Sequence, residues 1–367
     1  MRFLMLNWRD PRNPKSGGAE RVTQAYLAAL HQRGHEVFWF ANDFPGTRPE
    51  EVIDGVRIIR GGGQVTSVLK AMQWYRRQPR FDLVIDQHHG IPWFAPWWSR
   101  TNCISYLHEV LGPIWSSFYP WPFSTIGRWQ ERCAHWLYRK VPFWVGSEST
   151  ERALRRRGVN NVTVIHYGIA LKPLSELEPK PLRQPLQLIT VCRLAPNKRV
   201  DHAIEALHVL LLKGVDAHLT IVGGGEMENE LRRSASRPGL AGRVTFTGHI
   251  SETEKNEKLR RAHLLVHNSM REGWGLNVLE ANAMGTPAIV YPVDGLVEAT
   301  LHNQTGIVTR EETPESVAEG ILELLATPEK YEPFRVNACE RSRAFQWNQI
   351  LPPACDWLEK QAAGLIG

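Results

Sequence analysis

Residues 262–292 read AHLLVHNSMREGWGLNVLEANAMGTPAIVYP, and this stretch decides the fold class. It predicts a strand at 262–269, a glycine-rich turn, a short helix and a second strand at 286–292. Both strands are continuous apolar runs, as expected when helices cover both faces of a parallel sheet. The stretch therefore predicts an α/β unit in which a helix begins just after the carboxyl end of a strand.

The same alternation of apolar runs and helical patterns extends along the whole chain. In the first half we expect strands at 2–8, 36–42, 56–61, 81–87, 102–109, 142–147 and 162–168. In the second half we expect them at 186–193, 218–225, 243–249, 262–269, 286–292 and 305–309. A helix is expected from Gly18 to Arg33, with Gly34 as its stop. The pattern predicts the α/β class, with two Rossmann-like, doubly wound domains.

A domain boundary is indicated by residues 172–186, which contain four prolines and show no periodicity. We expect an N-terminal domain over 1–171, a Pro-rich linker over 172–185 and a C-terminal domain over 186–344. The C-terminal segment, about 345–367, is expected to be a helix that packs back on the N-terminal domain. Because open α/β sheets bind ligands at the carboxyl ends of their strands, a cleft between the two facing domains is the expected active site.

The composition excludes a disordered chain and a membrane-spanning one. Of the 367 residues 43% are hydrophobic and 22% are charged, as in globular proteins. No apolar run approaches 18 residues, and the apolar start is too short for a signal peptide. The five cysteines are scattered and fit neither a disulfide framework nor a zinc pattern, so a cytoplasmic location is expected.

The net charge of +6 is unevenly distributed, since the basic residues dominate the first half of the chain. Such a basic half indicates an anionic partner, such as a nucleotide, a phospholipid or a nucleic acid. A solvated basic surface without a partner remains the alternative at this point.

Two cations and two carboxylates stand at positions suited to a sugar nucleotide. Arg193 and Lys198 flank a loop that follows the first strand of the second half, where they could bind a diphosphate. Glu272 falls in the glycine-rich turn and Glu280 in the helix after it, so both could face one site. The alternatives are solvated loop cations, an ordinary helix glutamate, and glycines that serve the turn alone.

The first loop contains Ser16-Gly17-Gly18-Ala19-Glu20 before the first helix. It matches neither the G-x-G-x-x-G dinucleotide fingerprint nor a P-loop, so alone it is a weak signal.

In this order and spacing, the three motifs resemble the family 4 (group 1) retaining glycosyltransferases, which have the two-domain GT-B architecture. The resemblance covers essentially the whole chain. Further matches are His108 in Tyr106-Leu107-His108-Glu109, Ser147-Glu148-Ser149-Thr150, His166-Tyr167-Gly168-Ile169, and the run Gly295-Leu296-Val297-Glu298 with Gly306. The sequence departs from the family's usual pattern at Leu276-Asn277, Asp294 and Ile169-Ala170, which puts the sugar and base preferences in doubt.

The resemblance implies a role for each matching position. The implied catalytic residues are His108, Arg193, Lys198 and Glu272. The implied contacts to the diphosphate are Arg193 and Lys198, with Gly17 and Gly18 near phosphate and acceptor. The base is implied to meet the backbone from Gly248 to Ile250, and the ribose to meet Glu280. The sugar and phosphate are implied to meet Glu272 and the backbone of Trp274, Gly275, Leu276 and Asn277. His108 is implied to lie near the sugar.

The reaction is expected to proceed without a metal ion or another cofactor. No Asp-X-Asp motif occurs, and His88-His89 after Asp86 has no third ligand within sequence reach. Arg193, Lys198 and a helix N-terminus would supply the positive field instead. With no obvious covalent nucleophile, we expect attack on the same face with retention, the departing phosphate oxygen taking the acceptor proton.

The acceptor region is expected where eight of the 14 tryptophans cluster, between Trp93 and Trp144. A helix is expected over 126–140. One face carries Ile126, Trp129, Cys133, Trp136 and Leu137, and another carries Arg128, Arg132, His135 and Arg139. Tryptophan beside arginine suits a bilayer interface, so the first domain is expected to dock on the inner membrane face and take a lipid-linked acceptor. The candidate residues are Trp97, Trp98, Trp121, Arg128, Arg132 and Arg139; the alternative is a tryptophan core with solvated arginines.

Other classes remain open. A sugar-nucleotide epimerase would consume donor without an acceptor, and a phosphorylase of similar architecture would need a lysine-bound pyridoxal phosphate. A nucleic-acid-binding protein would show steeply salt-dependent binding, but no known nucleic-acid module is present.

Overall fold

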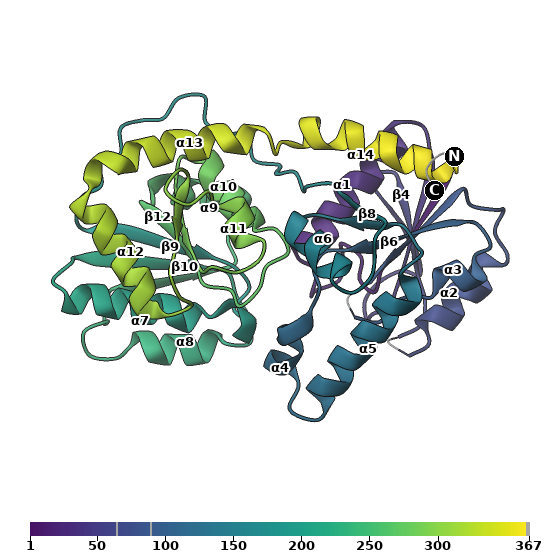
Figure 1. Ribbon diagram of the computed structural model, residues 1–367, viewed down its shortest axis with the longest axis horizontal. Helices are drawn as coiled ribbons and strands as arrows, with labels where there is room; N and C mark the ends of the chain where they lie inside the picture. Colours follow the sequence, from purple (N-terminus) through teal and green to yellow (C-terminus); the bar gives the residue numbers. More distant parts are fainter. Residues whose placement is uncertain (64, 89, 365–367) are drawn as a thin grey trace. The chain divides into compact units, whose positions relative to one another are not determined.

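The computed structural model describes residues 1–63, 65–88 and 90–364 (Figure 1). The chain forms two compact units, one made of Met1–Gly168 with the C-terminal segment from Trp347, the other of Ile169–Gln346. Each unit is a Rossmann-like α/β unit built on a largely or wholly parallel sheet.

The first unit has an eight-stranded sheet in the order β3-β4-β2-β1-β5-β6-β7-β8. The strands are β1 (Arg2–Leu6), β2 (Glu36–Ala41), β3 (Glu50–Ile53), β4 (Val56–Arg60), β5 (Leu83–Gln87), β6 (Asn102–Leu107), β7 (Phe143–Val145) and β8 (Val162–Val164). The helices are α1 (Gly18–Gln32), α2 (Ser67–Tyr75), α3 (Ala95–Trp98), α4 (Trp115–Phe118), α5 (Phe123–Tyr138), α6 (Glu148–Arg155) and α14 (Trp347–Ala362). All seven strands expected in this half are present, each within a few residues of its expected bounds.

One strand of this sheet was missed by the sequence prediction. β3 pairs antiparallel with β4 and forms the edge of the sheet. Asp54 and Gly55, both at positive φ (48° and 80°), make the two-residue turn between them. An Asp-Gly pair is the residue signal for such a hairpin, so the sequence did carry the information.

The sheet of the first unit is buried on both faces. Leu4 and Leu6 pack with Trp93 and Ala95 in one cluster beneath α2 and α3. On the other face α1 packs against α14, and Tyr26 of α1 meets Trp144 and Trp347 edge-on. The C-terminal helix therefore packs on the first unit as expected, beginning at Trp347 rather than near 345. Its expected last residues, 365–367, lie outside the described residues.

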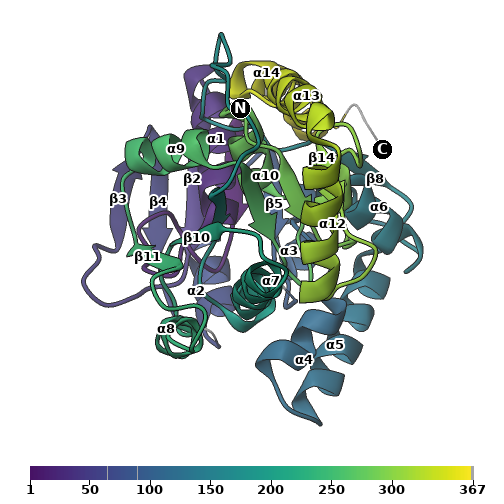
Figure 2. The same ribbon diagram turned by 90° about the vertical axis from the view of Figure 1, so that its left-hand side faces the viewer.

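The second unit has a six-stranded, wholly parallel sheet in the order β11-β10-β9-β12-β13-β14. The strands are β9 (Leu186–Val191), β10 (Ala217–Val222), β11 (Val244–Gly248), β12 (Leu264–His267), β13 (Ala288–Val290) and β14 (Gly306–Val308). The helices are α7 (Val200–Leu212), α8 (Glu228–Ala235), α9 (Glu252–Arg261), α10 (Leu276–Ala283), α11 (Leu296–Ala299), α12 (Pro314–Ala326) and α13 (Tyr331–Arg343). Helices α7, α8 and α12 cover one face of the sheet, and α9, α10 and α13 cover the other (Figure 2).

The stretch expected as a linker, 172–185, belongs to the second unit and packs on it. The Lys180 ammonium donates to the carbonyls of Arg260 (2.9 Å) and Ala262 (2.6 Å) and to the Thr286 hydroxyl (2.9 Å). Burial, with Arg335 nearby, lowers the pKa of Lys180 to about 7. A proline-rich composition thus marked the boundary but did not indicate this docking.

Among the described residues, no helix is both long enough and apolar enough to cross a bilayer.

Candidate active site

The predicted donor-binding residues of the second unit gather at one edge of its sheet. Because all six strands are parallel, their carboxyl ends meet at that edge. The loop 192–199 leaves β9, Gly223–Gly225 leave β10, the turn after Gly248 leaves β11, and the loop 268–275 leaves β12. The topology therefore brings together motifs that are far apart in the chain.

Glu272 is the centre of a charged cluster at this edge. Its Oε2 lies 2.6 Å from Lys198 Nζ and 3.3 Å from His267 Nε2. Burial alone would raise the pKa of Glu272, but the charge of Lys198 and the nearby His267 outweigh it and hold the pKa well below its usual value. The carboxyl is thus ionised at neutral pH and can accept hydrogen bonds, but it cannot act as a proton donor.

Arg193 lies on the same loop as Lys198 and differs from it in one respect. Its side chain is exposed, and within the described residues its guanidinium makes no hydrogen bond or ion pair. Of the two cations after β9, Lys198 is therefore already paired with a carboxylate, whereas Arg193 is available to a ligand.

Glycines on neighbouring loops allow the backbone to approach this edge closely. A Cβ on Gly223 (φ +122°) would lie 2.0 Å from the Cys192 carbonyl oxygen, and one on Gly225 would lie 2.4 Å from that of Leu194. Both positions admit only glycine without a shift of the loop that carries Arg193. Residues 223–225 were predicted as the end of a strand, which is wrong, although three successive glycines are a visible signal for a loop.

The turn before α10 presents backbone rather than the Trp274 indole. Trp274 is buried and packs against Phe345 with ring centroids 5.2 Å apart. Gly275 (φ +88°) is the N-cap of α10, whose first N–H groups have no helical acceptor. Asn277, in the first turn, uses its side-chain amide to donate to the Val191 carbonyl (2.8 Å). That the backbone from Trp274 to Asn277 contacts sugar and phosphate stays a prediction, and the Asn277 side chain itself is hydrogen-bonded to β9.

Glu280 is held by a lysine that the sequence analysis did not identify. Lys255 of α9 is almost completely buried, and its Nζ lies 2.8 Å from Glu280 Oε2 and 2.6 Å from Glu252 Oε2. A Cβ on Gly248 (φ +66°) would meet no atom of the described residues within 4 Å, and the half-buried Ile250 lies two residues further on. Gly248 is the last residue of β11, which lies next to β10 in the sheet, and Ile250 follows the strand.

In the first unit, His108 is buried and both of its ring nitrogens are engaged. The Gln87 amide oxygen accepts from Thr23 (2.9 Å), so the amide nitrogen donates to His108 Nε2 (2.8 Å). His108 Nδ1 then donates to the Tyr167 hydroxyl oxygen (2.6 Å). His108 could meet a substrate only by exchanging one of these bonds.

Gly17 and Gly18 lie where the first loop enters α1. The Gly17 N–H donates to Glu20 Oε2 (2.7 Å), and Glu20 also pairs with Arg9 (3.1 Å). The carboxylate of the chain itself therefore occupies this helix N-terminus.

The membrane or acceptor candidates divide into two groups. Trp97, Trp121, Arg128, Arg132 and Arg139 are exposed. Trp98 instead packs on the core, and its indole donates to the Trp93 carbonyl (2.9 Å).

The expected cationic face of α5 contains one error. His135, placed there with the arginines, is buried and bonded to Arg157 Nη1 (2.8 Å). Burial, with the Arg157 charge, lowers the pKa of His135 to about 2, so it stays neutral.

Asp86 and His88 were the residues considered for a metal, together with His89, which lies outside the described residues. Asp86 accepts from the N–H groups of Trp93 (3.0 Å) and Ala95 (3.1 Å) and from the Tyr138 hydroxyl (2.6 Å). In the part of the chain that the structure describes, no three His, Cys, Asp or Glu side chains are grouped to hold a metal ion.

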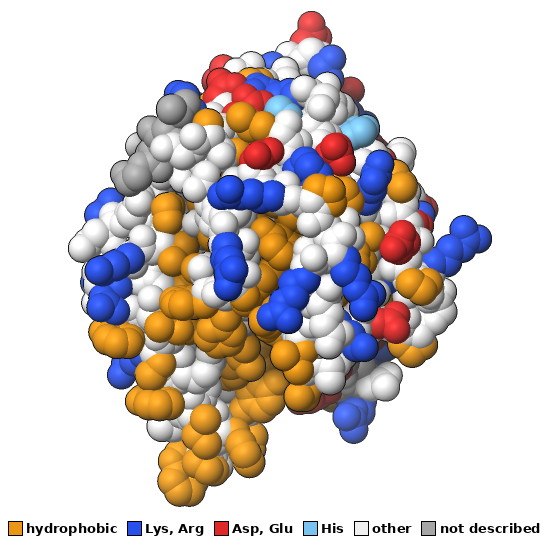
Figure 3. All heavy atoms as spheres, turned by 90° about the vertical axis from the view of Figure 1, so that its right-hand side faces the viewer, with side chains coloured by type: hydrophobic (Ala, Val, Ile, Leu, Met, Phe, Trp, Pro, Cys, Tyr) orange, Lys and Arg blue, Asp and Glu red, His pale blue; other side chains and the backbone are white. Residues whose placement is uncertain are grey.

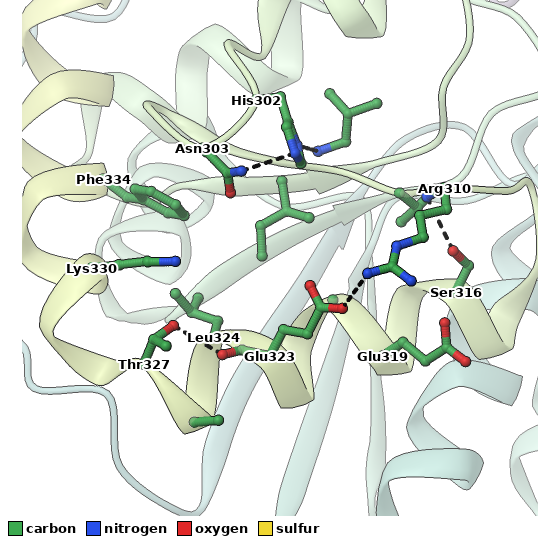
Figure 4. Close-up of a pocket in the computed structure, with 15 residues that line it drawn as sticks. His302, Asn303, Arg310, Ser316, Glu319, Glu323, Leu324, Thr327, Lys330 and Phe334 are labelled. Atoms are coloured by element: carbon green, nitrogen blue, oxygen red, sulfur yellow. Dashed lines mark hydrogen bonds and ion pairs between the residues drawn. The ribbon is translucent and has the colours of Figure 1, made fainter.

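A separate pocket of about 530 Å³ opens along α12 of the second unit (Figure 4). It is lined by α12, β14 and the turn at His302 and Asn303. Inside it Arg310 is paired with Glu323 (2.9 Å), and none of the predicted site residues lines it.

Comparisons with known proteins agree with this architecture. The family described as Glycosyltransferase Family 4 matches residues 16–172, and the one described as Glycosyl transferases group 1 matches residues 176–341. A glycogen synthase of Mycobacterium tuberculosis is 26% identical, covering 97% of this chain and 92% of its own. A GDP-mannose-dependent alpha-(1-6)-phosphatidylinositol dimannoside mannosyltransferase of the same organism is 31% identical over 53% of this chain and 51% of its own. The solved structure of HepE from Anabaena in complex with UDP-glucose has a TM-score of 0.74 at 19% identity, covering 98% of this chain and 100% of that one.

Two Rossmann-like units of this topology, together with the two family matches, place the protein in the GT-B class of glycosyltransferases. The two family matches together span most of the sequence. The chain belongs to the group 1, family 4 glycosyltransferases.

Proposed function

We propose that this glycosyltransferase moves a hexose-type sugar from a nucleoside-diphosphate sugar to a hydroxyl acceptor, with retention at the anomeric carbon and without a metal ion. The observation that carries the proposal is the cluster of Lys198, Glu272 and His267. Arg193 lies on the same loop as Lys198, is exposed, and forms no side-chain ion pair within the part of the chain that the structure describes. Together these residues combine a cationic binding site for a diphosphate with an ionised carboxylate for sugar hydroxyls.

Each residue of the second unit has a proposed part. Arg193 and Lys198 bind the diphosphate, because a planar guanidinium and a compact ammonium complement phosphate oxygens. Glu272 accepts hydrogen bonds from the transferred sugar, and Glu280 accepts them from the ribose. The backbone at the start of α10 donates to sugar and phosphate, and that of Gly248 to Ile250 meets the base. In the first unit we propose His108, Gly17 and Gly18 as further substrate contacts.

The chemical step follows from these charges. As the bond between the anomeric carbon and the phosphate oxygen breaks, negative charge grows on the diphosphate and positive charge on the sugar. Arg193, Lys198 and the N-terminus of α10 stabilise the former, which makes the diphosphate a better leaving group. The acceptor oxygen attacks the same face and bonds to the anomeric carbon, and its proton passes to the departing phosphate oxygen.

For the acceptor we propose a hydroxyl of a glycan or lipid-linked glycan, used in the cytoplasm at the inner membrane face in the assembly of a cell-envelope polysaccharide. The exposed tryptophans and arginines near α5 support this placement, and the name of one relative contains a glycolipid, phosphatidylinositol dimannoside.

A thermal-shift screen against UDP, GDP and ADP and their sugars tests the donor class, because a ligand that binds the folded state raises the melting temperature. We expect one nucleotide and its sugar to stabilise the second unit. The anomeric configuration of the product, read by NMR, tests retention, and unchanged turnover in EDTA tests metal independence. Inversion of the anomeric configuration would contradict retention, and a loss of activity in EDTA would contradict metal independence. No thermal shift with any nucleotide would contradict the proposed donor class. Donor consumption without an acceptor would indicate an epimerase instead.

A further inference from the structure

The first unit carries a group of exposed aromatic and aliphatic side chains, most of them on and next to α5, which we call the aromatic face. It consists of Trp97, Trp121, Phe123, Ile126, Trp129 and Trp136, each 52% to 81% exposed. Trp97 packs on Tyr138 of α5, with ring centroids 5.0 Å apart, which places it beside that helix. Figure 3 shows hydrophobic side chains gathered over the part of this face where α4 and α5 lie, with lysine and arginine side chains around them.

Helix α5 is organised in three stripes. One stripe, containing Glu131, Ala134 and Tyr138, is buried against the unit. The opposite stripe carries exposed apolar side chains at helical spacing, from Phe123 to Trp136. A soluble helix normally leaves the side opposite its buried stripe polar, so this exposed apolar stripe requires an occupant.

Three exposed arginines form the remaining stripe, between the buried and the apolar ones. These are Arg128, Arg132 and Arg139, and Arg139 also stacks over the Trp136 ring at 4.4 Å. Residues 110–140 contain one acidic residue, Glu131, which is buried and paired with Arg157 (3.2 Å). Within residues 110–140, the exposed charges beside the aromatic face are therefore all positive.

We propose that the aromatic face docks on a bilayer surface that contains anionic phospholipids, which deepens and rests on the proposed use of an acceptor at the membrane. Indole rings partition to the headgroup level, where one edge stays apolar and the other wet. The arginines then reach anionic headgroups while the apolar stripe enters the acyl boundary.

The charge pattern favours a membrane over a second copy of this chain. A symmetric dimer through this face would place the same arginine stripe on both sides of one interface, with no exposed carboxylate from 110–140 to offset it. An anionic lipid surface offers the complementary charge across the whole face.

Docking gives the enzyme a physical advantage. A chain held at the surface searches for a lipid-linked acceptor in two dimensions, which raises the effective concentration of that acceptor. The α5 helix would lie parallel to the surface, with its apolar stripe buried roughly 5–10 Å into the headgroup region.

Vesicle flotation of the full chain tests the proposal. We expect the protein to float with vesicles of phosphatidylcholine and phosphatidylglycerol and to bind much less to vesicles of phosphatidylcholine alone. The triple variant Arg128→Gln/Arg132→Gln/Arg139→Gln should weaken binding to the anionic vesicles on the order of a hundredfold, at about fivefold per lost cation. Its matched control, Lys213→Gln/Arg233→Gln/Arg310→Gln, removes the same charge from exposed positions of the second unit and should bind as the wild type does.

The apolar part is tested by Trp121→Ser/Trp129→Ser, which should weaken flotation at least tenfold. The control Leu212→Ser/Val336→Ser, at exposed positions of the second unit, should leave it unchanged. In each variant, an unchanged melting temperature shows that the fold is intact.

Equal binding by the variants and the wild type, or no binding to anionic vesicles, would overturn the docking proposal. So would a stable dimer that the tryptophan variant abolishes, because the face would then be a protein interface. The nucleotide thermal shift separates the two proposals: a chain that binds nucleotide but not vesicles refutes only the docking.

Discussion

At the scale of single residues, Arg193 and Lys198 follow the same strand but differ in what they contact. Lys198 is paired with Glu272, whereas the Arg193 guanidinium is exposed. We predict that Arg193→Ala lowers turnover by roughly 10²–10³, the usual loss for one group that stabilises developing charge. The melting temperature should not change. Steady-state kinetics with the responding sugar nucleotide measure this, and Arg237→Ala on the same unit is the control; a change of only a few-fold would contradict the proposed role.

Lys255 is a positioning residue for Glu280. Removing its ammonium by Lys255→Met leaves Glu280 without the ion pair at 2.8 Å. We predict a donor KM about tenfold higher, the value of one charge-assisted hydrogen bond, with kcat within about twofold. Glu252→Gln, which breaks only the other ion pair of Lys255, should leave both constants near wild type. A fall in kcat without a change in KM would argue against the ribose contact.

His263 makes the stability of the second unit depend on pH. Burial, with the Lys180 charge nearby, lowers its pKa to about 4, and its Nδ1 accepts the Gln187 N–H (2.9 Å). The unfolded chain binds a proton below about pH 6.5 that the folded chain takes up only near pH 4. The free energy of unfolding of the second unit is thus unaffected by protonation of His263 above about pH 6.5, where the side chain is neutral in both states. It decreases as the pH falls from about 6.5 toward 4, because the unfolded chain takes up the proton first. In urea unfolding of wild type and His263→Asn across this range, the variant should show the shallower pH dependence; parallel curves would refute the assignment.

At the scale of elements, the sequence predicted nearly all strands of the two sheets, but it missed the edge strand β3 and misplaced one residue on the faces of α5. All thirteen expected strands exist, because continuous apolar runs between turn signals are typical of parallel sheets. The antiparallel β3 was missed, since its alternating half-exposed pattern does not form such a run. On α5 the apolar and arginine stripes were predicted correctly, but His135 was not, because spacing alone does not show which edge of a polar stripe turns inward.

The glycine loop after β10 restricts the position of the neighbouring loop that carries Arg193. Gly223→Ala would place a Cβ 2.0 Å from the Cys192 carbonyl oxygen and would displace the loop that carries Arg193. We predict that this variant loses the nucleotide thermal shift. Gly214→Ala is the matched control: its φ of +79° gives comparable backbone strain, about 1–2 kcal/mol, but no atom lies within 4 Å of the new Cβ. The control should therefore be less stable yet keep nucleotide binding, and loss of binding in both would contradict the prediction.

At the scale of the whole molecule, the chain returns to its first unit through α14. Arg33 of that unit pairs with Asp356 (2.6 Å) and Glu359 (3.2 Å), and Leu358 is fully buried. We predict that Leu358→Ala costs the first unit about 2–5 kcal/mol of stability. Limited proteolysis should then cleave within residues 1–168 at lower temperature, while 169–346 keeps its wild-type resistance. Equal weakening of both units would contradict the division of the chain.

By itself, the sequence determined the alternation of strands and helices, the glycine and cation motifs and their order, because these depend on neighbours within a few residues. The tertiary structure alone decided the contacts that give those residues their chemistry. Lys198 meets Glu272 across 74 positions of sequence and Lys255 meets Glu280 across 25. Lys180 of the Pro-rich stretch docks against carbonyls about 80 residues away. The physical reason is that such pairs are fixed by strand order and helix packing, which local spacing does not encode.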